Sequence, residues 1–215
     1  FYSNLMGTSV IHILSADTSL ARVDFTDLPL QTLMEMLVDG FHTKTGLEDD
    51  NGYKPIEEWM DVRMNEGNVV DIDWRDEESP SPTGGTVALR WLPSTVIEFA
   101  LTGSQMEGTI DIRLLPDPIE RLCLQRNSVS GTVDLMALKP KLYAVILHTN
   151  KFQGTPDLRG VPASMRYLQL HKNRFEGTVV VGKLPEGIKI TTRGTAIVGF
   201  VNEDGTPAKY PTGKC

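Results

Sequence analysis

Short segments in which apolar and polar residues alternate recur along most of the chain. The clearest pairs of large apolar residues separated by one residue are Leu122 and Leu124, Val145 and Leu147, and Leu168 and Leu170. This alternation places both large side chains on one face of a strand, while the residue between them points to the opposite face. We therefore predict short strands whose apolar residues face a dry interior.

The predicted strands belong to a repeat of constant length. A Gly-Thr dipeptide returns every 23 residues without slippage, starting at positions 85, 108, 131, 154 and 177. Leu101, Leu124, Leu147 and Leu170 follow the same spacing. One such unit cannot bury its own apolar edge, so successive units must stack and align their strands roughly 4.8 Å apart. The period therefore predicts a solenoid with a continuous apolar interior.

One polar position also recurs in each unit. It holds Ser104 in the first clear copy and Asn127, Asn150 and Asn173 in the next three. An asparagine side chain both donates and accepts hydrogen bonds, so at a fixed turn it satisfies backbone groups of adjacent coils that stacking buries. We expect Ser104 to do this less well. The recurring glycine is expected where the chain turns and a Cβ atom would clash.

Written out, the unit is LxxLxLxxNxFxGTVDLxxLP, with four clear copies over residues 94–185. This unit resembles a leucine-rich repeat. The copy from Asn150 to Pro156 is most similar to the plant-type subclass, whose loop reads NxFxGxIP, and the GTVDLxxLP ending is similar to versions in protist proteins. The resemblance implies an α/β fold, namely a leucine-rich-repeat solenoid with a ladder of parallel strands, about five coils and a helical N-terminal cap. A degenerate copy starts at Val69 and carries an insertion at 79–83.

The chain before the repeats has a different pattern. Apolar residues at helical spacing between Leu30 and Phe41 predict an amphipathic helix, with Asp27 as its cap and Gly40 near its end. Residues 1–26 are strand-like around 10–14 and 21–25.

A second capping signal lies just before the first repeat. The segment 59–69 resembles the N-terminal cap of plant-type leucine-rich repeats, although Asp61 and Met64 stand where a glycine and a cysteine are expected. After the repeats, Ile188 and Ile190 begin a sixth coil that loses the motif. We therefore divide the chain into an N-terminal capping region (1–68), the repeats (69–187) and a C-terminal cap or tail (188–215).

The residues that flank and separate the leucines of each strand face outward and form columns across the predicted concave face. The candidate binding residues of this face are Asp71, Asp73, Glu98, Arg121, Cys123, Gln125, Arg126, Ile146, His148, Tyr167, Gln169, His171 and Lys172. Acidic residues gather in the first units, and basic residues and histidines in the later ones. Aromatic residues and arginine are enriched at protein interfaces, so this composition favours a protein contact surface. A solvated face without a partner is the alternative.

Composition narrows the class of partner. The 215 residues include 21 Lys and Arg and 28 Asp and Glu, a net charge of −7, with no cluster of basic residues. A phosphate backbone selects the opposite pattern, so we expect no nucleic-acid binding. The apolar runs are far shorter than the roughly 20 residues of a membrane-spanning helix, so we expect no direct membrane insertion. The absence of Asn-x-Ser/Thr sequons and of the cap cysteine favours an intracellular or organellar location over secretion.

Chemistry is expected to be sparse. His148 and His171 lie one repeat apart in the same column, which places their rings on adjacent strands. A zinc site needs about four ligands, and the nearest further candidate, Cys123, lies in another column and coil. No nucleophile motif or phosphate-binding glycine loop is present. We therefore expect no cofactor and no catalytic activity, and a metal or enzyme site at the His148/His171 column is the weakest alternative.

A fold does not determine a function, so the functional expectation comes from the resemblance. It implies a non-catalytic protein–protein interaction module. Two versions compete, and the absence of the cap cysteine and of sequons favours the first. In one, the chain is an accessory subunit packed permanently in a larger complex through its cap, insertion and tail. In the other, it is a receptor-like domain that recognises a peptide or partner with its concave face.

Overall fold

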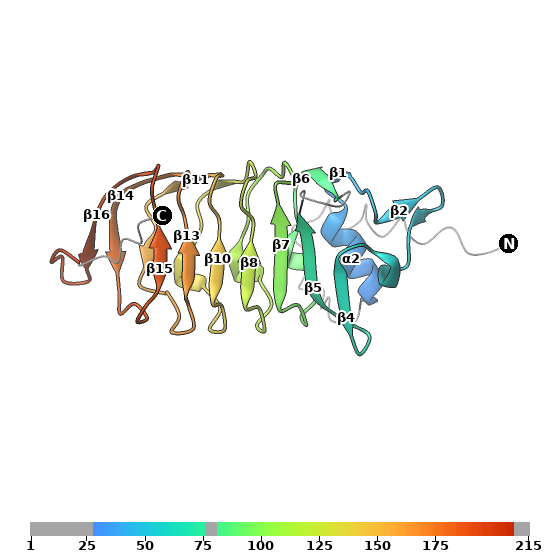
Figure 1. Cartoon of the computed structure of the whole chain (residues 1–215), viewed down its shortest axis with the longest axis horizontal. Helices are drawn as coiled ribbons and strands as arrows, with labels where there is room; N and C mark the ends of the chain where they lie inside the picture. The colour runs from blue at the N-terminus through green and yellow to red at the C-terminus, as the bar shows by residue number, and fades with distance from the viewer. Residues whose placement is uncertain (1–27, 76–80, 209–215) are drawn as a thin grey trace, which may run out of the picture.

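The computed structural model describes residues 28–75 and 81–208, which form one elongated solenoid (Figure 1). The strands expected within residues 1–26 and the capping role of Asp27 lie outside these residues. The main strands lie side by side along the long axis, and helix α2 (Leu30–Val38) covers the N-terminal end (Figure 1). The predicted leucine-rich-repeat solenoid with a helical cap is confirmed.

The front of the solenoid is a seven-stranded sheet with the order β15-β13-β10-β8-β7-β5-β4. Its strands are β4 (Val62–Asn65), β5 (Asn68–Arg75), β7 (Glu98–Thr102), β8 (Arg121–Cys123), β10 (Ala144–Ile146), β13 (Tyr167–Gln169) and β15 (Lys189–Thr191). β4 pairs with β5 in antiparallel fashion, and the other neighbours are parallel. We call the outward surface of this sheet the front face.

The return half of each coil contains short strands and 3-10 segments. The strands are β9 (Ser130–Gly131), β11 (Lys151–Gly154), β12 (Asp157–Leu158), β14 (Arg174–Val181) and β16 (Ala196–Asn202), and the 3-10 segments are η3 (Leu89–Trp91), η4 (Ile112–Leu114) and η5 (Leu135–Ala137). The carboxylates of Asp111 and Asp134 accept hydrogen bonds from the backbone N–H groups two residues later, which starts η4 and η5.

The recurring apolar residues form one interior. Leu124, Leu147 and Leu170 are at most 1% exposed, as the alternating pattern predicted. Phe152 and Phe175, one repeat apart, stack with ring centroids 6.2 Å apart. Burial of such side chains is the main stabilising contribution in a solenoid, because each coil presents its apolar edge to the next.

The repeated asparagines bridge adjacent coils. Asn150 donates from Nδ2 to the carbonyl oxygens of Leu124 and Leu147, at 2.7 and 3.2 Å, and its Oδ1 accepts from the Val129 N–H at 3.0 Å. Asn127 and Asn173 make the equivalent bonds one coil earlier and one coil later. The predicted role of this position is confirmed.

Ser104 occupies the same position but makes a different bond. Its hydroxyl donates only to the Thr102 carbonyl, at 3.3 Å. The backbone N–H that an asparagine would bind in this coil belongs to Thr83, and it donates instead to Oγ1 of Thr43, at 3.1 Å. Thr43 lies in β1 (Phe41–Thr43), which pairs with β6 (Thr83–Gly85). The N-terminal cap therefore supplies the acceptor that asparagine supplies elsewhere.

The repeated glycine has the backbone conformation that its position requires. Gly131 has a φ of 83°, in the left-handed region, and a Cβ atom there would lie 3.0 Å from Cγ2 of Thr109 in the preceding coil. Both the backbone angle and the close approach explain why glycine recurs at this turn.

The cap packs its apolar residues onto the first coil. α2 buries Met34, Leu37 and Val38, and it ends at Val38, shortly before Gly40. Phe41 and Phe99 both lie edge-on to Trp74, with centroid distances of 5.9 and 6.4 Å. The cap also contains the hairpin of β2 (Glu48–Asp49) and β3 (Gly52–Tyr53), followed by η2 (Ile56–Glu58).

At the other end, the solenoid continues beyond the last clear repeat. Ile188 and Ile190 are buried, and β15 pairs with β13, so the sixth coil predicted from these residues is confirmed. β16 extends the return half by pairing with β14. Within residues 28–75 and 81–208, no helix combines the length and the apolar character that crossing a membrane requires.

Candidate functional site

The front face aligns the outward residues in the columns read from the sequence. The first column contains Asp71, Glu98, Arg121, Ala144, Tyr167 and Lys189, and the second contains Asp73, Ala100, Cys123, Ile146, Gln169 and Thr191. A third column begins with Arg75 opposite Thr102, and the repeat spacing continues it to Gln125, His148 and His171. The candidate residues of these columns therefore lie on the same side of the sheet.

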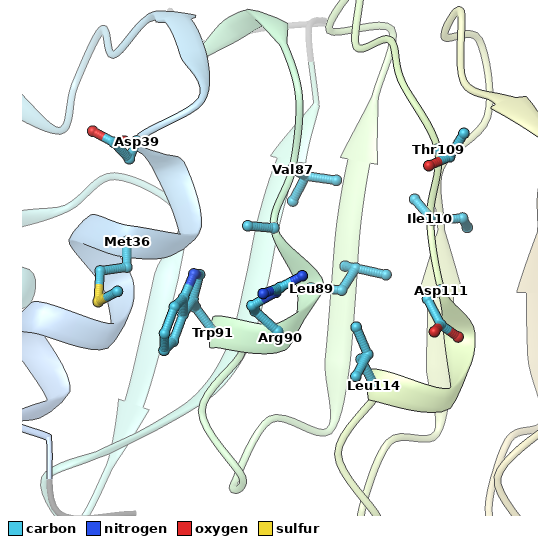
Figure 2. Close-up of a pocket in the computed structure, with 11 residues that line it drawn as sticks. Met36, Asp39, Val87, Leu89, Arg90, Trp91, Thr109, Ile110, Asp111 and Leu114 are labelled. Atoms are coloured by element: carbon cyan, nitrogen blue, oxygen red, sulfur yellow. The ribbon is translucent and has the colours of Figure 1, made fainter. Parts of the chain in front are cut away.

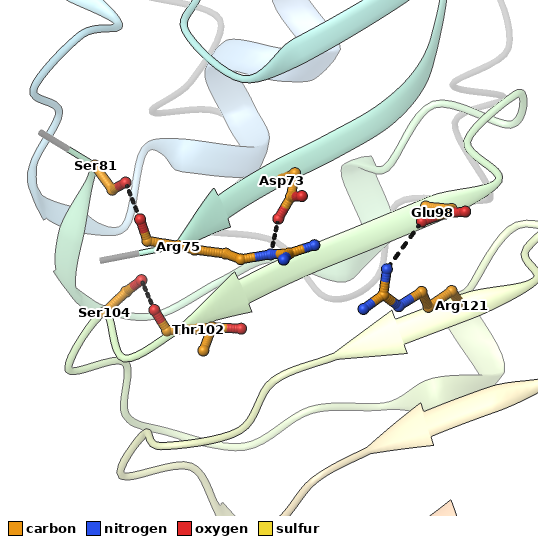
Figure 3. A network of polar contacts seen from close by, with 7 residues as sticks. All are labelled: Asp73, Arg75, Ser81, Glu98, Thr102, Ser104 and Arg121. Atoms are coloured by element: carbon orange, nitrogen blue, oxygen red, sulfur yellow. Dashed lines mark hydrogen bonds and ion pairs between the residues drawn. The ribbon is translucent and has the colours of Figure 1, made fainter. Parts of the chain in front are cut away.

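The early part of the front face is acidic, but its carboxylates are paired with arginines. Arg63 binds Asp71 at 3.2 Å, and Arg121 binds Glu98 at 3.4 Å across two strands. Asp73 binds Arg75 on the same strand (Figure 3). Exposed pairs of this kind contribute at most about 1 kcal/mol each to stability. Their effect is to neutralise much of the acidic character of this part.

The middle of the front face is less accessible than the sequence pattern indicates. Cys123 is only 1% exposed, and burial raises the pKa of its thiol, although the neighbouring Arg121 opposes the shift. Cys123 therefore lies in the predicted column, but its covered side chain offers almost no surface to a partner. Ile146 is half-buried beside it. Oγ1 of Thr102 and Oε1 of Gln125 are buried side-chain oxygens without a hydrogen-bond partner.

The two histidines lie on the late part of the front face, which consists of β10, β13, β15 and the turns that follow them. Their rings stack with centroids 4.3 Å apart and planes at 17°. Nδ1 of His148 lies 3.1 Å from the Thr149 hydroxyl, and Nδ1 of His171 lies 2.8 Å from the Thr191 hydroxyl. The predicted adjacency of the two rings is confirmed.

Both histidines are held in the neutral form. Burial, and then electrostatic repulsion from His171 when it is protonated and from the cations Arg126 and Lys172, lower the pKa of His148 to about 4. Burial and Lys172 also lower the pKa of His171. Two protonated rings in a stack would repel each other, so a neutral pair is the form that the geometry favours at neutral pH.

Further charged and aromatic residues lie on or beside the same part of the front face as the histidines. Tyr167 is 40% exposed, and the ammonium group of Lys189 lies 5.5 Å from its ring centroid. Arg126 and Lys172 are exposed and adopt left-handed backbone conformations in the turns that follow β8 and β13. In the part of the chain that the structure describes, no three His, Cys, Asp or Glu residues converge as metal ligands would.

A second surface feature was not predicted. A hollow of about 440 Å³ lies between α2, η3 and η4 (Figure 2). Its lining combines apolar Met36, Trp91 and Leu114 with charged Arg90 and Asp111. No pattern in the sequence indicates this hollow, because the helix and the 3-10 segments meet only once the cap has packed on the first coil.

Comparison with known proteins places the fold. No family model and no curated sequence matches the chain. The leucine-rich-repeat ectodomain of the receptor kinase SOBIR1 from Arabidopsis thaliana is similar, with a TM-score of 0.55 and 18% identity over 85% of this chain and 99% of that chain. The BIR3–SERK2 complex from Arabidopsis thaliana gives a TM-score of 0.56 at 17% identity, over 85% and 97%. A plant ice-binding protein gives 0.53 at 16% identity, over 80% and 71%.

At these identities the likeness concerns the fold alone. The repeat motif, the aligned strands and the asparagine bridges agree with it. The chain therefore has the leucine-rich-repeat fold, and it is similar in architecture to plant leucine-rich-repeat ectodomains.

Proposed function

We propose that the chain is a non-catalytic protein-interaction module whose front face binds a segment of another protein. The observation that carries this proposal is the difference between the two sides of each front strand. The inward residues are almost the same in every coil, whereas the outward residues change at each step and combine Arg121, Ile146, Tyr167 and His171 on one surface. Interfaces use such mixtures of arginine, aromatic and aliphatic groups.

The comparisons support a recognition role without identifying a partner. One neighbour is the ectodomain of a receptor kinase, and another was solved as a complex of BIR3 with SERK2. In the BIR3–SERK2 case, the similar architecture is therefore part of a complex between two proteins. For this chain, we take the receptor-like arrangement, in which a partner lies across the front strands, as the leading version.

A specific observation favours the accessory-subunit version as a second candidate. The hollow between α2, η3 and η4 is lined in part by Leu114, an apolar side chain that is 44% exposed, and the following 3-10 segment, η5, carries Met136, which is 48% exposed. Exposed apolar residues beside a hollow are typical of contact sites. A permanent neighbour in a larger complex would cover this surface and leave the front face free.

The two versions are tested by a pair of arginine variants. Arg121 lies on the front face, whereas Arg113 lies in η4 and is paired with Asp111, which lines the hollow. The native protein is first crosslinked under mild conditions, so that its partner can be identified and purified. Binding of that partner is then measured for Arg121→Glu and Arg113→Glu.

The front-face proposal predicts crosslinks near Arg121, Arg126 and Lys172, and about tenfold weaker binding for Arg121→Glu with little change for Arg113→Glu. The reverse order, with crosslinks on the cap and the 3-10 segments, would establish the accessory-subunit version. The melting temperatures of the two variants serve as the control for folding.

A further inference from the structure

We propose that the late part of the front face is a site for the carboxylate side chains of an acidic protein segment. This late part consists of β10, β13, β15 and the turns that follow them. The inference rests on the proposed function, because it names the chemistry of the segment that the front face would bind.

The first argument is the distribution of charge. The stretches 143–149, 166–172 and 188–194 contain no Asp or Glu, although the chain as a whole has a net charge of −7. The same stretches contain Arg166, Lys172, Lys189 and Arg193. Positive charge is therefore concentrated in one region of an otherwise acidic protein, and such a region attracts acidic ligands.

The second argument is a contrast in ion pairing. In the early part, Asp71, Asp73 and Glu98 are each bound by an arginine. In the late part, Lys172, Lys189 and Arg193 form no ion pair with any residue in the described ranges. The early part thus satisfies its own charges, whereas the late part keeps cations available to a partner.

The histidine stack supplies the third argument. Nδ1 of each ring is engaged by a threonine hydroxyl, from Thr149 or Thr191. When the hydroxyl donates to Nδ1, the ring proton lies on Nε2, so each ring presents an N–H donor. With centroids 4.3 Å apart, the two stacked rings bring two N–H donors, the groups that carboxylate oxygens accept from, into one small region of the face.

The charges around the stack also connect binding to protonation. Burial keeps the His148 ring neutral, and so do the cations Arg126 and Lys172 and the charge that His171 would carry if it were protonated. The negative charge of a bound carboxylate offsets part of the repulsion from these cations, so it raises the pKa of His148 and favours the protonated ring. Binding should therefore take up protons and become tighter as the pH falls.

A protein segment fits this surface better than a long polyanion. Tyr167 and Ile146 provide aromatic and aliphatic contacts beside the cations, which suits an extended peptide. Asp71 and Asp73 lie on the same sheet and already occupy the neighbouring arginines, so the early part offers little positive charge to a nucleic acid that ran along the whole face.

The experiment uses the full chain and three labelled probes, namely a short poly-glutamate peptide, a matched poly-glutamine peptide and a DNA oligonucleotide of equal charge. Fluorescence anisotropy measures binding by the unmodified chain, by Lys172→Glu and by Lys151→Glu. Lys151 is an exposed residue of β11 in the return half of the coil, so it is a matched control for the change in net charge.

We expect poly-glutamate to bind and poly-glutamine not to bind. Lys172→Glu should weaken poly-glutamate binding about tenfold, while Lys151→Glu should change it less than about twofold. Binding should strengthen between about pH 7.5 and about pH 5.5, and this pH effect should disappear in His148→Gln. Equal weakening by the two lysine variants, or tighter binding of DNA than of poly-glutamate, would overturn the inference.

The carboxylate site and the proposed function can fail independently, and the experiments distinguish the two failures. A natural partner that crosslinks to the front face but does not compete with poly-glutamate would contradict the carboxylate site and leave the interaction module intact. Poly-glutamate binding that depends on Lys172, with the natural partner held at the hollow instead, would keep the site and contradict the front face as the partner surface.

Discussion

The interior and the front face are built from the same short strands, but they carry different information. Going from coil to coil, the interior position of Leu101, Leu124, Leu147 and Leu170 does not change, and an asparagine follows three residues later in all of these coils except the first. The outward neighbours in the same strands change at each step, from Glu98 to Arg121, Ala144 and Tyr167. The repeated inward residues therefore build the scaffold, and the varied outward residues are available to recognise a partner.

The contrast has a physical basis. Stacking one coil on another requires identical interior shapes, since a gap or a clash in one coil is transmitted to its neighbours. Outward side chains have no such requirement, because solvent accommodates most of them. A matched pair of substitutions, one inward and one outward, should therefore separate the two roles.

The largest effect is expected for an interior aromatic residue. Phe152 is 0% exposed and stacks on Phe175, so Phe152→Ala should lower the free energy of unfolding by about 3–5 kcal/mol. The outward control is Tyr167→Ala, which removes a 40% exposed ring and its contact with Lys189 and should cost less than about 1 kcal/mol. Urea unfolding measures both. Similar losses from the two variants would mean that Tyr167 also belongs to the interior.

An intermediate effect is expected where the regular interior meets the cap. Ser104→Asn restores the asparagine of the repeat, yet it should destabilise the chain by about 1–3 kcal/mol, because Ser104 is fully buried and the Thr83 N–H already binds Thr43. Thermal or urea unfolding measures the change. In a Thr43→Val background the loss should be smaller, since the amide becomes available. If Ser104→Asn alone stabilised the chain, the hydrogen bond from the Thr83 N–H to Thr43 would not be an adequate substitute for the asparagine bond of the other coils.

The smallest effect concerns the pH dependence of stability. The pKa of His148 is lowered from 6.5 to about 4 in the folded state, so between these values the unfolded chain binds more protons than the folded chain. The free energy of unfolding should therefore decrease as the pH falls through this window, and the loss should be absent above it. The free energy of unfolding of His148→Gln should decrease less steeply over the same pH range. Because the variant and the unmodified chain contain the same carboxylates, the difference between the two slopes reports on His148 alone. An unchanged slope would contradict the lowered pKa.

Sequence patterns predicted the parts of the molecule that depend on local repetition. The inward leucines, the asparagine bridges, the outward columns and the adjacency of His148 and His171 all follow from a period that the chain keeps without slippage. Each of these features is determined by one coil and its immediate neighbour, so the pattern of a single repeat contains them.

The features that were missed depend on contacts between unlike segments. Thr43 takes the place of an asparagine only because β1 pairs with β6, and the period does not extend to the cap. The hollow beside Trp91 arises where α2 packs on η3. The coverage of Cys123 depends on neighbouring side chains, which strand alternation does not describe.

The central claim is that asparagines hold the coils together while the front face remains outside the folding core. Urea unfolding of Asn150→Ala and Arg121→Glu tests it most directly. Asn150→Ala leaves the backbone groups of Leu124, Leu147 and Val129 without their partner and should lower the free energy of unfolding by roughly 3 kcal/mol. Arg121→Glu loses one exposed ion pair and adds repulsion with Glu98, so it should cost at most about 1 kcal/mol. Equal losses from the two variants would contradict the assignment of inward and outward faces.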